Sequence, residues 1–526
     1  MTKVRRVFMV DGKPFFPLGA EFLYVSGYSV RDQSETEASF KAVKSACGNT
    51  ILIPIYWDQF EPEENKFDFA SVDSLLSLAR RYDIKLILLW FATWKNGNMD
   101  FTPIWVKSNP QRFKRVLSAT GQAIWVLSSH CEANLEADKK AFTALCGYLK
   151  AKDAAEHTII GIQVENEPGI AGSDRDYGPE AQTILDSLVP TTLVSAMKTA
   201  GKGQIYDLWQ QTGGKETGTW TELFGYSSGE LMTAWSIANY IDSLAQAGKA
   251  IHDIPMFINV WLMEQPWWPI PGEAYASGGA VTKVLDIYKW FTPHIDLIAP
   301  DIYVADAKGR DAVCASYARE DNPLFVPESH GGLEMIRPIA DFNAIGYFAW
   351  IREGSDTVLP RHQKRIDIMR CIASVIPLLL KYQGTGKIHA IVQEDGLQVQ
   401  HLDMEGYMGL VEFGTWRKRS MQADLTSIDL GGGLVIQASK NEFYLVGTNY
   451  RLKLRAKPTL DKMQATLLFT HHRRPEYLKY LLSVDEGHFD QNDKFVSDRR
   501  RNGDEIVYGM GVDPEVGVVR VITCDC

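Results

Sequence analysis

The stretch Thr158-Ile-Ile-Gly-Ile-Gln-Val-Glu-Asn-Glu167 is the most informative part of this 526-residue sequence. Most of it is apolar, as is typical of a parallel strand that is buried on both faces. It nevertheless ends on Glu-Asn-Glu, although a carboxylate is costly to bury without a partner. A buried strand that ends in this way indicates a functional site at its carboxyl end.

Seven further short apolar runs lie on either side of this stretch. Between them are segments with apolar residues three to four positions apart, which predict helices. Eight β units separated by helices predict an α/β fold, namely a (β/α)₈ TIM barrel. The seven other runs are Phe15–Phe22, Thr50–Trp57, Ile84–Trp94, Pro255–Trp261, Ile295–Tyr303, Leu324–Glu328 and Ala344–Trp350.

The chain divides into three predicted parts. Residues 1–360 form the catalytic barrel, with a long insertion at about 170–230 that is rich in Gly, Ser, Thr and charge and is suited to a lid or an oligomer contact. Residues 361–385 read as one connecting helix. Residues 386–526 show short alternating runs and turn signals, which predict a smaller C-terminal antiparallel β domain resembling a sandwich.

Composition excludes several classes of protein. With 45% hydrophobic and 23% charged residues, the chain is neither disordered nor short of core material, and its net charge of −10 argues against a nucleic-acid partner. No apolar run is long enough to span a membrane, and the first residues do not resemble a signal peptide. The seven cysteines form no CxxC pair. We therefore expect a cytoplasmic protein with no membrane partner, no metal and no cofactor.

Side chains at the predicted strand ends are acids, amides and large aromatics, which suit a polyhydroxy ring. Glu167 and Glu328 end the fourth and seventh runs, so that they can face each other across the barrel mouth. Two such carboxyls are what glycoside hydrolysis needs, about 5–5.5 Å apart for retention and about 6.5–9.5 Å for inversion. No cluster of histidines accompanies them, which argues against a metal-dependent barrel hydrolase.

Several stretches resemble clan A of the retaining glycoside hydrolases, and more narrowly the β-galactosidases of glycoside hydrolase family 35 or a close clan A family such as family 42. The resemblance covers about residues 7–355. It is carried by Met9–Glu21, Gly48–Trp57 with Glu61-Pro-Glu, Leu89–Gly97, Val164-Glu-Asn-Glu-Pro-Gly169, Ala299-Pro-Asp-Ile-Tyr303 and Phe325-Val-Pro-Glu328.

This resemblance implies roles for individual residues. Glu167 is expected to be the acid/base and Glu328 the nucleophile. Asn166 would donate to the sugar 2-hydroxyl, Tyr303 would hold Glu328, and Trp350 would form the floor under the ring. The O3, O4 and O6 side of galactose would be bound by Glu21, Trp94 and Asn96.

The sequence therefore predicts an exo-acting retaining β-galactosidase that works by double displacement on a galactoside or oligosaccharide, and we expect a homo-oligomer. Phe91-Ala-Thr-Trp-Lys-Asn96 departs from the usual family 35 segment, so a β-glucosidase or β-xylosidase stays open. A carbohydrate-binding pseudoenzyme is a further alternative. Glu165 is expected to be structural, with its side chain hydrogen-bonded inside the barrel.

Overall fold

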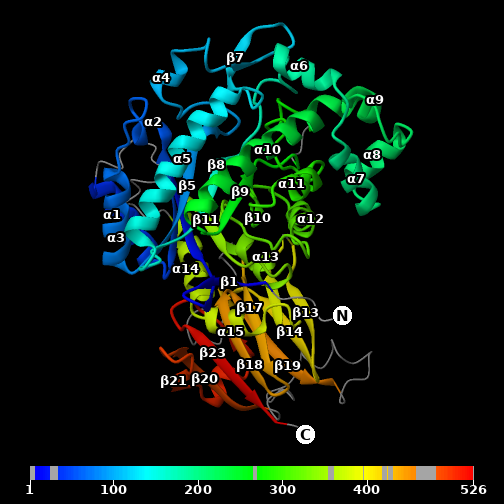
Figure 1. The fold of residues 1–526 in the computed structure, drawn as a ribbon. Coiled ribbons are helices and arrows are strands. Elements are labelled where there is room, and N and C mark those ends of the chain that lie inside the picture. Colours follow the sequence, from blue (N-terminus) through cyan, green and yellow to red (C-terminus); the bar gives the residue numbers. More distant parts are fainter. Residues whose placement is uncertain are drawn as a thin grey trace.

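The computed structural model describes residues 6–23, 33–264, 269–352, 360–394, 396–416, 423–424, 430–457 and 481–524. Its N-terminal part is a curled parallel sheet covered by helices, and its C-terminal part is antiparallel (Figure 1). Both features were predicted from the sequence, and the α/β fold class is confirmed. Within the described ranges, no helix combines the length and apolar character needed to cross a membrane.

Seven parallel strands make up the curled sheet, in the order β10-β9-β8-β5-β4-β3-β11. Each one falls on a run that the sequence predicts to be a buried strand. The strands are β3 (Leu18–Leu23), β4 (Thr50–Tyr56), β5 (Lys85–Lys95), β8 (Ile159–Asn166), β9 (Met256–Val260), β10 (Leu297–Pro300) and β11 (Tyr347–Arg352).

The remaining run, 324–328, bridges the gap between β10 and β11 without forming a regular strand. The Ile302 N–H donates to the Glu328 carbonyl at 2.8 Å, and the Phe348 N–H donates to the Val326 carbonyl at 2.8 Å. Pro327 has no N–H to donate, which interrupts the ladder in this segment. The barrel therefore closes through isolated parallel bridges, and these place Glu328 at the same edge as the other strand ends.

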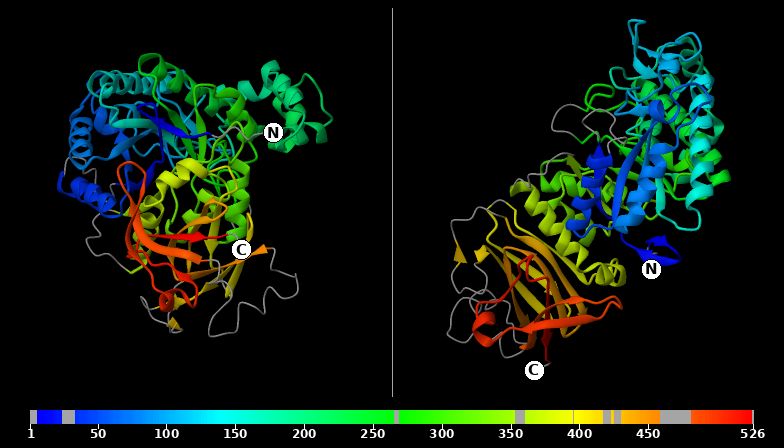
Figure 2. Two further views of the ribbon diagram at one scale, coloured as in Figure 1. Left: turned by 90° about the horizontal axis from the view of Figure 1, so that it is seen from below. Right: turned by 90° about the vertical axis from the view of Figure 1, so that its left-hand side faces the viewer.

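Helices pack around the outside of the sheet (Figure 2). The two longest, α5 and α10, lie against each other. These outer helices are α1 (Gln33–Ser45), α2 (Trp57–Phe60), α3 (Ala70–Tyr82), α4 (Ile104–Lys107), α5 (Glu132–Asp153), α10 (Ser228–Ile251), α11 (Leu285–Phe291), α12 (Ala307–Tyr317) and α13 (Ile336–Ala340).

The segment 170–230 is largely helical and packs on α10 through α6 and α9. Trp220 is fully buried, and a capping box between Thr219 and Glu222 begins the helix that carries it. The segment contains α6 (Pro179–Asp186), α7 (Thr191–Ala200), α8 (Gln204–Gln211) and α9 (Trp220–Phe224), and it lies near the hairpin of β6 (Arg115–Leu117) and β7 (Ala123–Leu127) at the top of Figure 1.

Two helices occupy the segment that the sequence suggested as one connecting helix. These are α14 (Pro360–Ala373) and α15 (Ile376–Tyr382). Pro377 lies in the first turn of α15, where its missing N–H is tolerated, whereas inside a continuous helix it would remove a hydrogen bond. Proline therefore explains the break.

Beyond α15, two antiparallel sheets pack face to face. The larger has the order β12-β17-β18-β23-β20-β21 and the smaller β13-β14-β19-β22. Their strands are β12 (Ile388–Val392), β13 (Val399–Met404), β14 (Tyr407–Phe413), β17 (Gly432–Ser439), β18 (Glu442–Thr448), β19 (Tyr450–Ala456), β20 (Leu481–Phe489), β21 (Phe495–Arg500), β22 (Met510–Gly511) and β23 (Val518–Thr523). Short pairs are β1 (Phe8–Val10) with β2 (Lys13–Phe15) and β15 (Thr415–Trp416) with β16 (Ala423–Asp424).

Strands β17 and β18 of the larger sheet are apolar on both faces, and the two faces pack into two different cores. On β17, Val435 belongs to the core between the two sheets, whereas Leu434 and Ile436 pack into the core that they share with the barrel helices. The same alternation occurs on β18, because successive side chains of a strand point to opposite faces. The antiparallel part is therefore joined to the barrel by a continuous apolar core.

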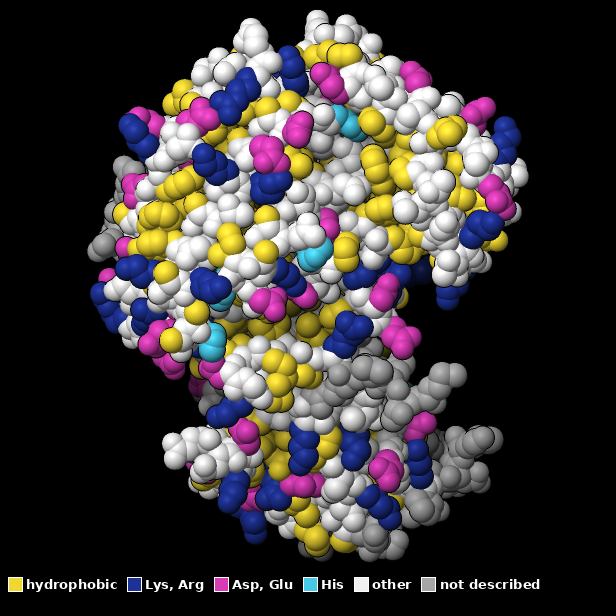
Figure 3. Space-filling model, viewed as in Figure 1, with side chains coloured by type: hydrophobic (Ala, Val, Ile, Leu, Met, Phe, Trp, Pro, Cys, Tyr) yellow, Lys and Arg dark blue, Asp and Glu magenta, His cyan; other side chains and the backbone are white. Residues whose placement is uncertain are grey.

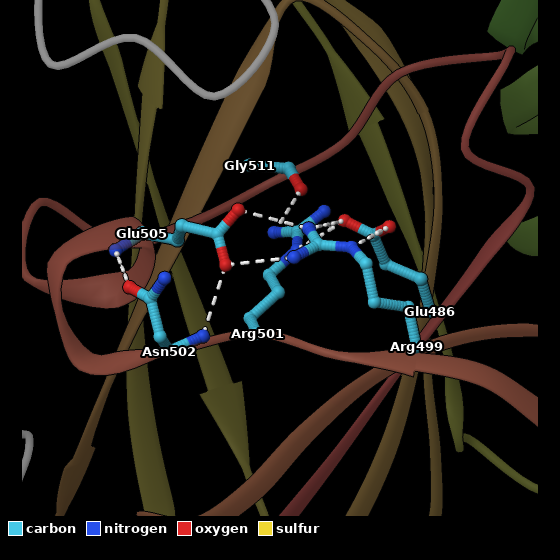
Figure 4. A network of polar contacts seen from close by, with 6 residues as sticks. All are labelled: Glu486, Arg499, Arg501, Asn502, Glu505 and Gly511. Atoms are coloured by element: carbon cyan, nitrogen blue, oxygen red, sulfur yellow. Dashed lines mark hydrogen bonds and ion pairs between the residues drawn. The ribbon is translucent and has the colours of Figure 1, made fainter.

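A network of ion pairs holds β21 and the turn that follows it (Figure 4). Arg499 pairs with Glu486 and Glu505, each at 2.9 Å. Arg501 donates to Glu486 at 2.8 Å and to the Gly511 carbonyl at 2.8 Å. The network ties the strand pair β20–β21 to the short helix α16 (Gly503–Ile506). Elsewhere on the face shown in Figure 3, charges of both signs are interspersed.

Gly432 provides a test of the shared core. A side chain there would meet the Leu333 Cδ2 at 2.7 Å and the Ile391 carbonyl at 2.8 Å, closer than real contacts allow. We expect Gly432→Val to lower the free energy of unfolding by about 1–3 kcal/mol, as overpacking does. Denaturant unfolding followed by circular dichroism measures this. Gly503→Ala is the control, because a Cβ at Gly503 would meet no atom within 4 Å. Equal stability of the two variants would contradict the close packing around Gly432.

Candidate active site

Four carboxyl groups gather at the carboxyl ends of the parallel strands. Glu21 lies on β3, Glu167 follows β8, Asp301 follows β10, and Glu328 lies in the segment that closes the barrel. Each of the four residues is at most 8% exposed. They meet because the carboxyl ends of neighbouring parallel strands share one edge of the sheet.

Asn259, on β9, connects this cluster. Its Oδ1 accepts from the Glu167 N–H at 2.7 Å. Its Nδ2 donates to the Asn166 Oδ1 at 3.1 Å, the Asp301 Oδ2 at 2.8 Å and the Glu328 Oε1 at 3.3 Å. One amide side chain therefore spans the distance between the two glutamates that the sequence singles out, and they lie in one compartment.

Glu328 has a second donor. The Tyr303 hydroxyl donates to its Oε2 at 3.0 Å, and the ring of Tyr303 meets the edge of His330 at 5.0 Å between centroids. Each of the two carboxyl oxygens of Glu328 therefore accepts a hydrogen bond, one from Asn259 and one from Tyr303.

Asn166 and Asn96 lie side by side next to the acids. The Asn166 Nδ2 donates to the Asn96 Oδ1 at 3.4 Å, and the Asn96 N–H donates to the Asn166 carbonyl at 3.1 Å. Asn96, Glu165 and Glu167 all have left-handed backbone conformations, with φ values of 51°, 63° and 45°. Such conformations in residues other than glycine are uncommon and concentrate at functional sites.

Burial and mutual repulsion shift the pKa values of these acids. Burial, followed by the negative charge of Glu328, raises the pKa of Glu167 to about 7, although Lys95 acts in the opposite direction. The pKa of Glu21 is raised well above its usual range, mainly by burial and then by Glu328. The pKa of Asp301 is raised well above its usual range for the same two reasons. Each of these three acids therefore keeps its proton to a higher pH than a free carboxyl group does.

The two predicted tryptophans differ in their surroundings. Trp350 lies on β11 directly beside Glu21 of β3 in the parallel register and is partly exposed. Trp94 is fully buried, and its ring meets Tyr240 edge-on at 4.8 Å between centroids. The roles of both in binding a substrate stay predictions.

Asn259 and Asp301 were absent from the predicted site, although both are visible in the sequence as polar residues at strand ends. Asp301 alone resembles a structural acid, and nothing in the sequence shows that Asn259 reaches three strand ends. Within the described ranges, no group of three or more His, Cys, Asp and Glu side chains is arranged to hold a metal ion.

Comparison with protein families gives two matches. Residues 31–211 match a family described as β-galactosidase, glycoside hydrolase family 42, and residues 369–513 match a domain of unknown function, DUF5597. The first match covers β4, β5 and β8 with Asn96, Asn166 and Glu167. The resemblance to the clan A β-galactosidases is confirmed, and family 42 rather than family 35 is the one matched. No curated protein matches the sequence.

Three matches among solved structures are the following. The catalytic domain of β-amylase from Paenibacillus polymyxa is 12% identical, with 66% of this chain and 95% of that chain covered and a TM-score of 0.44. A β-galactosidase from Bacillus circulans sp. alkalophilus is 11% identical (69% and 57% covered, TM-score 0.47). One from the psychrophilic Marinomonas ef1 is 10% identical (70% and 60% covered, TM-score 0.44). The chain thus spans less than two thirds of either β-galactosidase.

Glu21 allows a test of the electrostatics that does not depend on activity. Because its pKa is higher in the folded state than the usual 4.5, the folded protein keeps a proton that the unfolded chain loses, and stability falls as the pH rises above about 4.5. Glu21→Gln removes this loss. We expect the variant to gain stability relative to the parent between pH 5 and pH 8, by up to about 1.4 kcal/mol per pH unit, in denaturant unfolding.

Glu222→Gln is the matched control. The Thr219 N–H lowers the pKa of Glu222, so its contribution to stability is present at high pH and lost as the pH falls. Below about pH 5 that variant should lose stability relative to the parent as the pH rises, which is the opposite sign, and between pH 5 and pH 8 its difference from the parent should stay constant. The same pH dependence in both variants would show that Glu21 carries no raised pKa.

Proposed function

We propose that this chain is an exo-acting retaining β-galactosidase in which Glu167 is the acid/base and Glu328 the nucleophile. The observation that carries the proposal is the bridge through Asn259, which joins the backbone of Glu167 to the carboxylate of Glu328. The family 42 match over residues 31–211 supports a glycoside hydrolase. Retention, exo action and the identity of the sugar are proposed.

The first step needs one neutral and one ionised carboxyl. Glu167 gives its proton to the glycosidic oxygen, the bond from that oxygen to the anomeric carbon breaks, and Glu328 forms an ester bond to the carbon. With a pKa of about 7, Glu167 retains enough proton at neutral pH to act as the acid. The donors Tyr303 and Asn259 hold the attacking carboxylate of Glu328 in place.

The second step uses the same two groups with one role exchanged. Glu167, now ionised, takes a proton from water as the water oxygen attacks the anomeric carbon, and the ester bond to Glu328 breaks. Two inversions at one carbon return the original configuration. The product of a β-galactoside is therefore first released as the β-anomer.

The residues around the acids are proposed to bind the sugar. Asn166 would donate to the 2-hydroxyl, and Trp350 would support the apolar face of the ring, as aromatic side chains do in sugar sites. Glu21, Trp94 and Asn96 would bind the remaining hydroxyls. A homo-oligomer and a cytoplasmic location stay predictions.

A panel of p-nitrophenyl glycosides tests the identity of the sugar. We expect the β-D-galactoside to give the highest kcat/KM, with the β-D-glucoside, the β-D-xyloside and the α-D-galactoside well below it. Proton NMR of the first product formed from the preferred substrate tests retention. Release of the α-anomer from a β-substrate would contradict double displacement.

Substitution separates the roles of the two glutamates. Glu328→Gln should lower kcat by on the order of 10⁴-fold or more because the covalent step is lost. Glu167→Gln should lower it by about 10²–10⁴-fold on a substrate with a poor leaving group. Added azide should restore turnover in the alanine variants, giving the α-glycosyl azide with Glu328→Ala and the β-glycosyl azide with Glu167→Ala.

Glu334→Gln is the control for these substitutions. Glu334 lies six residues after Glu328 in the short 3₁₀ helix Gly332–Met335 and pairs with Arg310 at 3.6 Å, outside the proposed machinery. Its kcat should be unchanged. Full activity of Glu328→Gln would end the assignment.

The pH dependence follows from the proton on Glu167. Because the acid must be protonated, kcat/KM should fall above a pKa of about 7, about tenfold per pH unit at its limit. Glu167→Gln should remove that alkaline limb with an activated aryl substrate, whose leaving group needs no proton. An alkaline limb that persists in this variant would assign it to another group.

A further inference from the structure

A second pair of acids lies inside the barrel wall, beside the proposed catalytic cluster. Glu165 is on β8, two residues before Glu167, and Asp138 is on α5; both are 0% exposed. The carboxyl groups of Glu165 and Asp138 are close enough to interact directly, and each affects the pKa of the other. Two ionised carboxylates have no hydrogen to share, so this contact requires a proton on one of them.

Asp138 is the member better suited to the negative charge: burial raises its pKa, but its hydrogen-bond donors act in the opposite direction. It accepts from the Trp90 Nε1 at 2.9 Å, the Thr93 hydroxyl at 2.7 Å and the Tyr240 hydroxyl at 3.2 Å. Three donors stabilise an ionised carboxylate. No cation of the described chain forms an ion pair with Asp138 or with Glu165.

Glu165 is the member that keeps the proton. Burial raises its pKa well above the usual range, and the negative charge of Asp138 raises it further. Its Oε2 still accepts from the Trp94 N–H at 2.7 Å. A protonated carboxyl can do both at once, accepting with one oxygen and donating to Asp138 with the other.

The Trp94 N–H lies where the ladder between β5 and β8 is irregular. Trp90 pairs with Val164 in register, but the next pair is Lys95 with Asn166, so β5 contributes several more residues than β8 over this interval. Such bulges bend a strand and redirect the side chains beyond it. Within this irregular interval the Trp94 N–H donates to the Glu165 side chain.

Beyond the bulge, the two strands meet again at the proposed active site. The Asn96 N–H donates to the Asn166 carbonyl, and the Gly97 N–H donates to the Glu167 carbonyl, each at 3.1 Å. Asn96 and Glu167 both have left-handed backbones, which the surrounding contacts have to maintain.

We propose that Glu165 and Asp138 share one buried proton and act as a clamp on the bulge of β5, positioning Asn96 and Glu167 for the reaction. Neither acid touches the substrate, so both are positioning residues. The consequence for catalysis rests on the proposed function, whereas the shared proton and the clamp do not.

The kinetic test compares two replacements of Glu165. Glu165→Gln keeps the shape, an acceptor for the Trp94 N–H and a donor to Asp138, so kcat should stay within about threefold of the parent enzyme. Glu165→Ala removes the clamp and should lower kcat by about 10²-fold with little change in KM, as a misplacement of about 1 Å does. Glu165→Met, which fills the same space, replaces the alanine variant if that variant does not fold.

Asp153→Asn is the matched control. Asp153 is a buried carboxylate near the opposite end of β8, where it accepts from the Ile159 N–H at 2.7 Å and pairs with Arg80 at 2.8 Å. This substitution should lower the melting temperature and leave kcat unchanged. Two results would overturn the role as a clamp. One is a folded Glu165→Ala variant with the kcat of the parent, and the other is a Glu165→Gln variant whose kcat falls as far as that of Glu165→Ala.

An infrared measurement tests the proton without any substrate. The difference spectrum of the parent minus Glu165→Gln at neutral pH should contain the C=O stretching band of a protonated carboxyl. Its absence would overturn the shared proton whatever the enzyme hydrolyses. Conversely, activity retained in Glu328→Gln would defeat the proposed function and leave this band in place.

Discussion

The repulsion among four buried carboxyl groups at one edge of a parallel sheet is the constraint on which the site depends. Among the groups that shift the pKa of Glu167, only Lys95 opposes this repulsion by its own charge. The remaining compensation comes from protons kept on the acids and from donors such as Asn259 and Tyr303. Such a cluster lowers the stability of the folded protein, because burying carboxyl groups costs free energy that the cluster itself does not return. It becomes useful when a neutral acid and an ionised one are needed a few ångströms apart.

The barrel and the antiparallel region depend on each other through apolar surface. The alternation on β17 and β18 directs one set of side chains into the core between the two sheets and the other set toward the barrel helices. A free sandwich would expose the second set to water as a large apolar patch, which isolated soluble domains avoid. The match of residues 369–513 to a domain of unknown function begins within α14, and this helix contacts β18. The antiparallel region therefore covers apolar surface of the barrel helices, a contact that stabilises both parts.

The sequence was sufficient to predict the strands, because buried parallel strands leave a local apolar pattern, and the polar residues at their ends stand out as candidates for a site. All seven regular strands fall on predicted runs, and Glu21, Asn96, Asn166, Glu167, Tyr303 and Glu328 lie at one edge. What escaped prediction depends on geometry between distant segments. The interruption at Pro327, the reach of Asn259 across three strand ends and the contact between Glu165 and Asp138 have no local pattern.

The position of Glu165 explains why a strand would carry three polar residues in a row at its buried end. Alternation alone would direct Glu165 and Glu167 to the same side of the sheet, because residues two positions apart in a strand share a face. The left-handed backbone at Glu165 and Glu167 departs from that rule, and the bulge opposite them in β5 provides the room. An apolar side chain at 165 would leave the Trp94 N–H without an acceptor inside the barrel wall, where an unpaired donor is costly. In the proposed clamp, one side chain therefore has two roles: it accepts from the Trp94 N–H and it interacts with Asp138, beside the left-handed backbone that leads to Glu167.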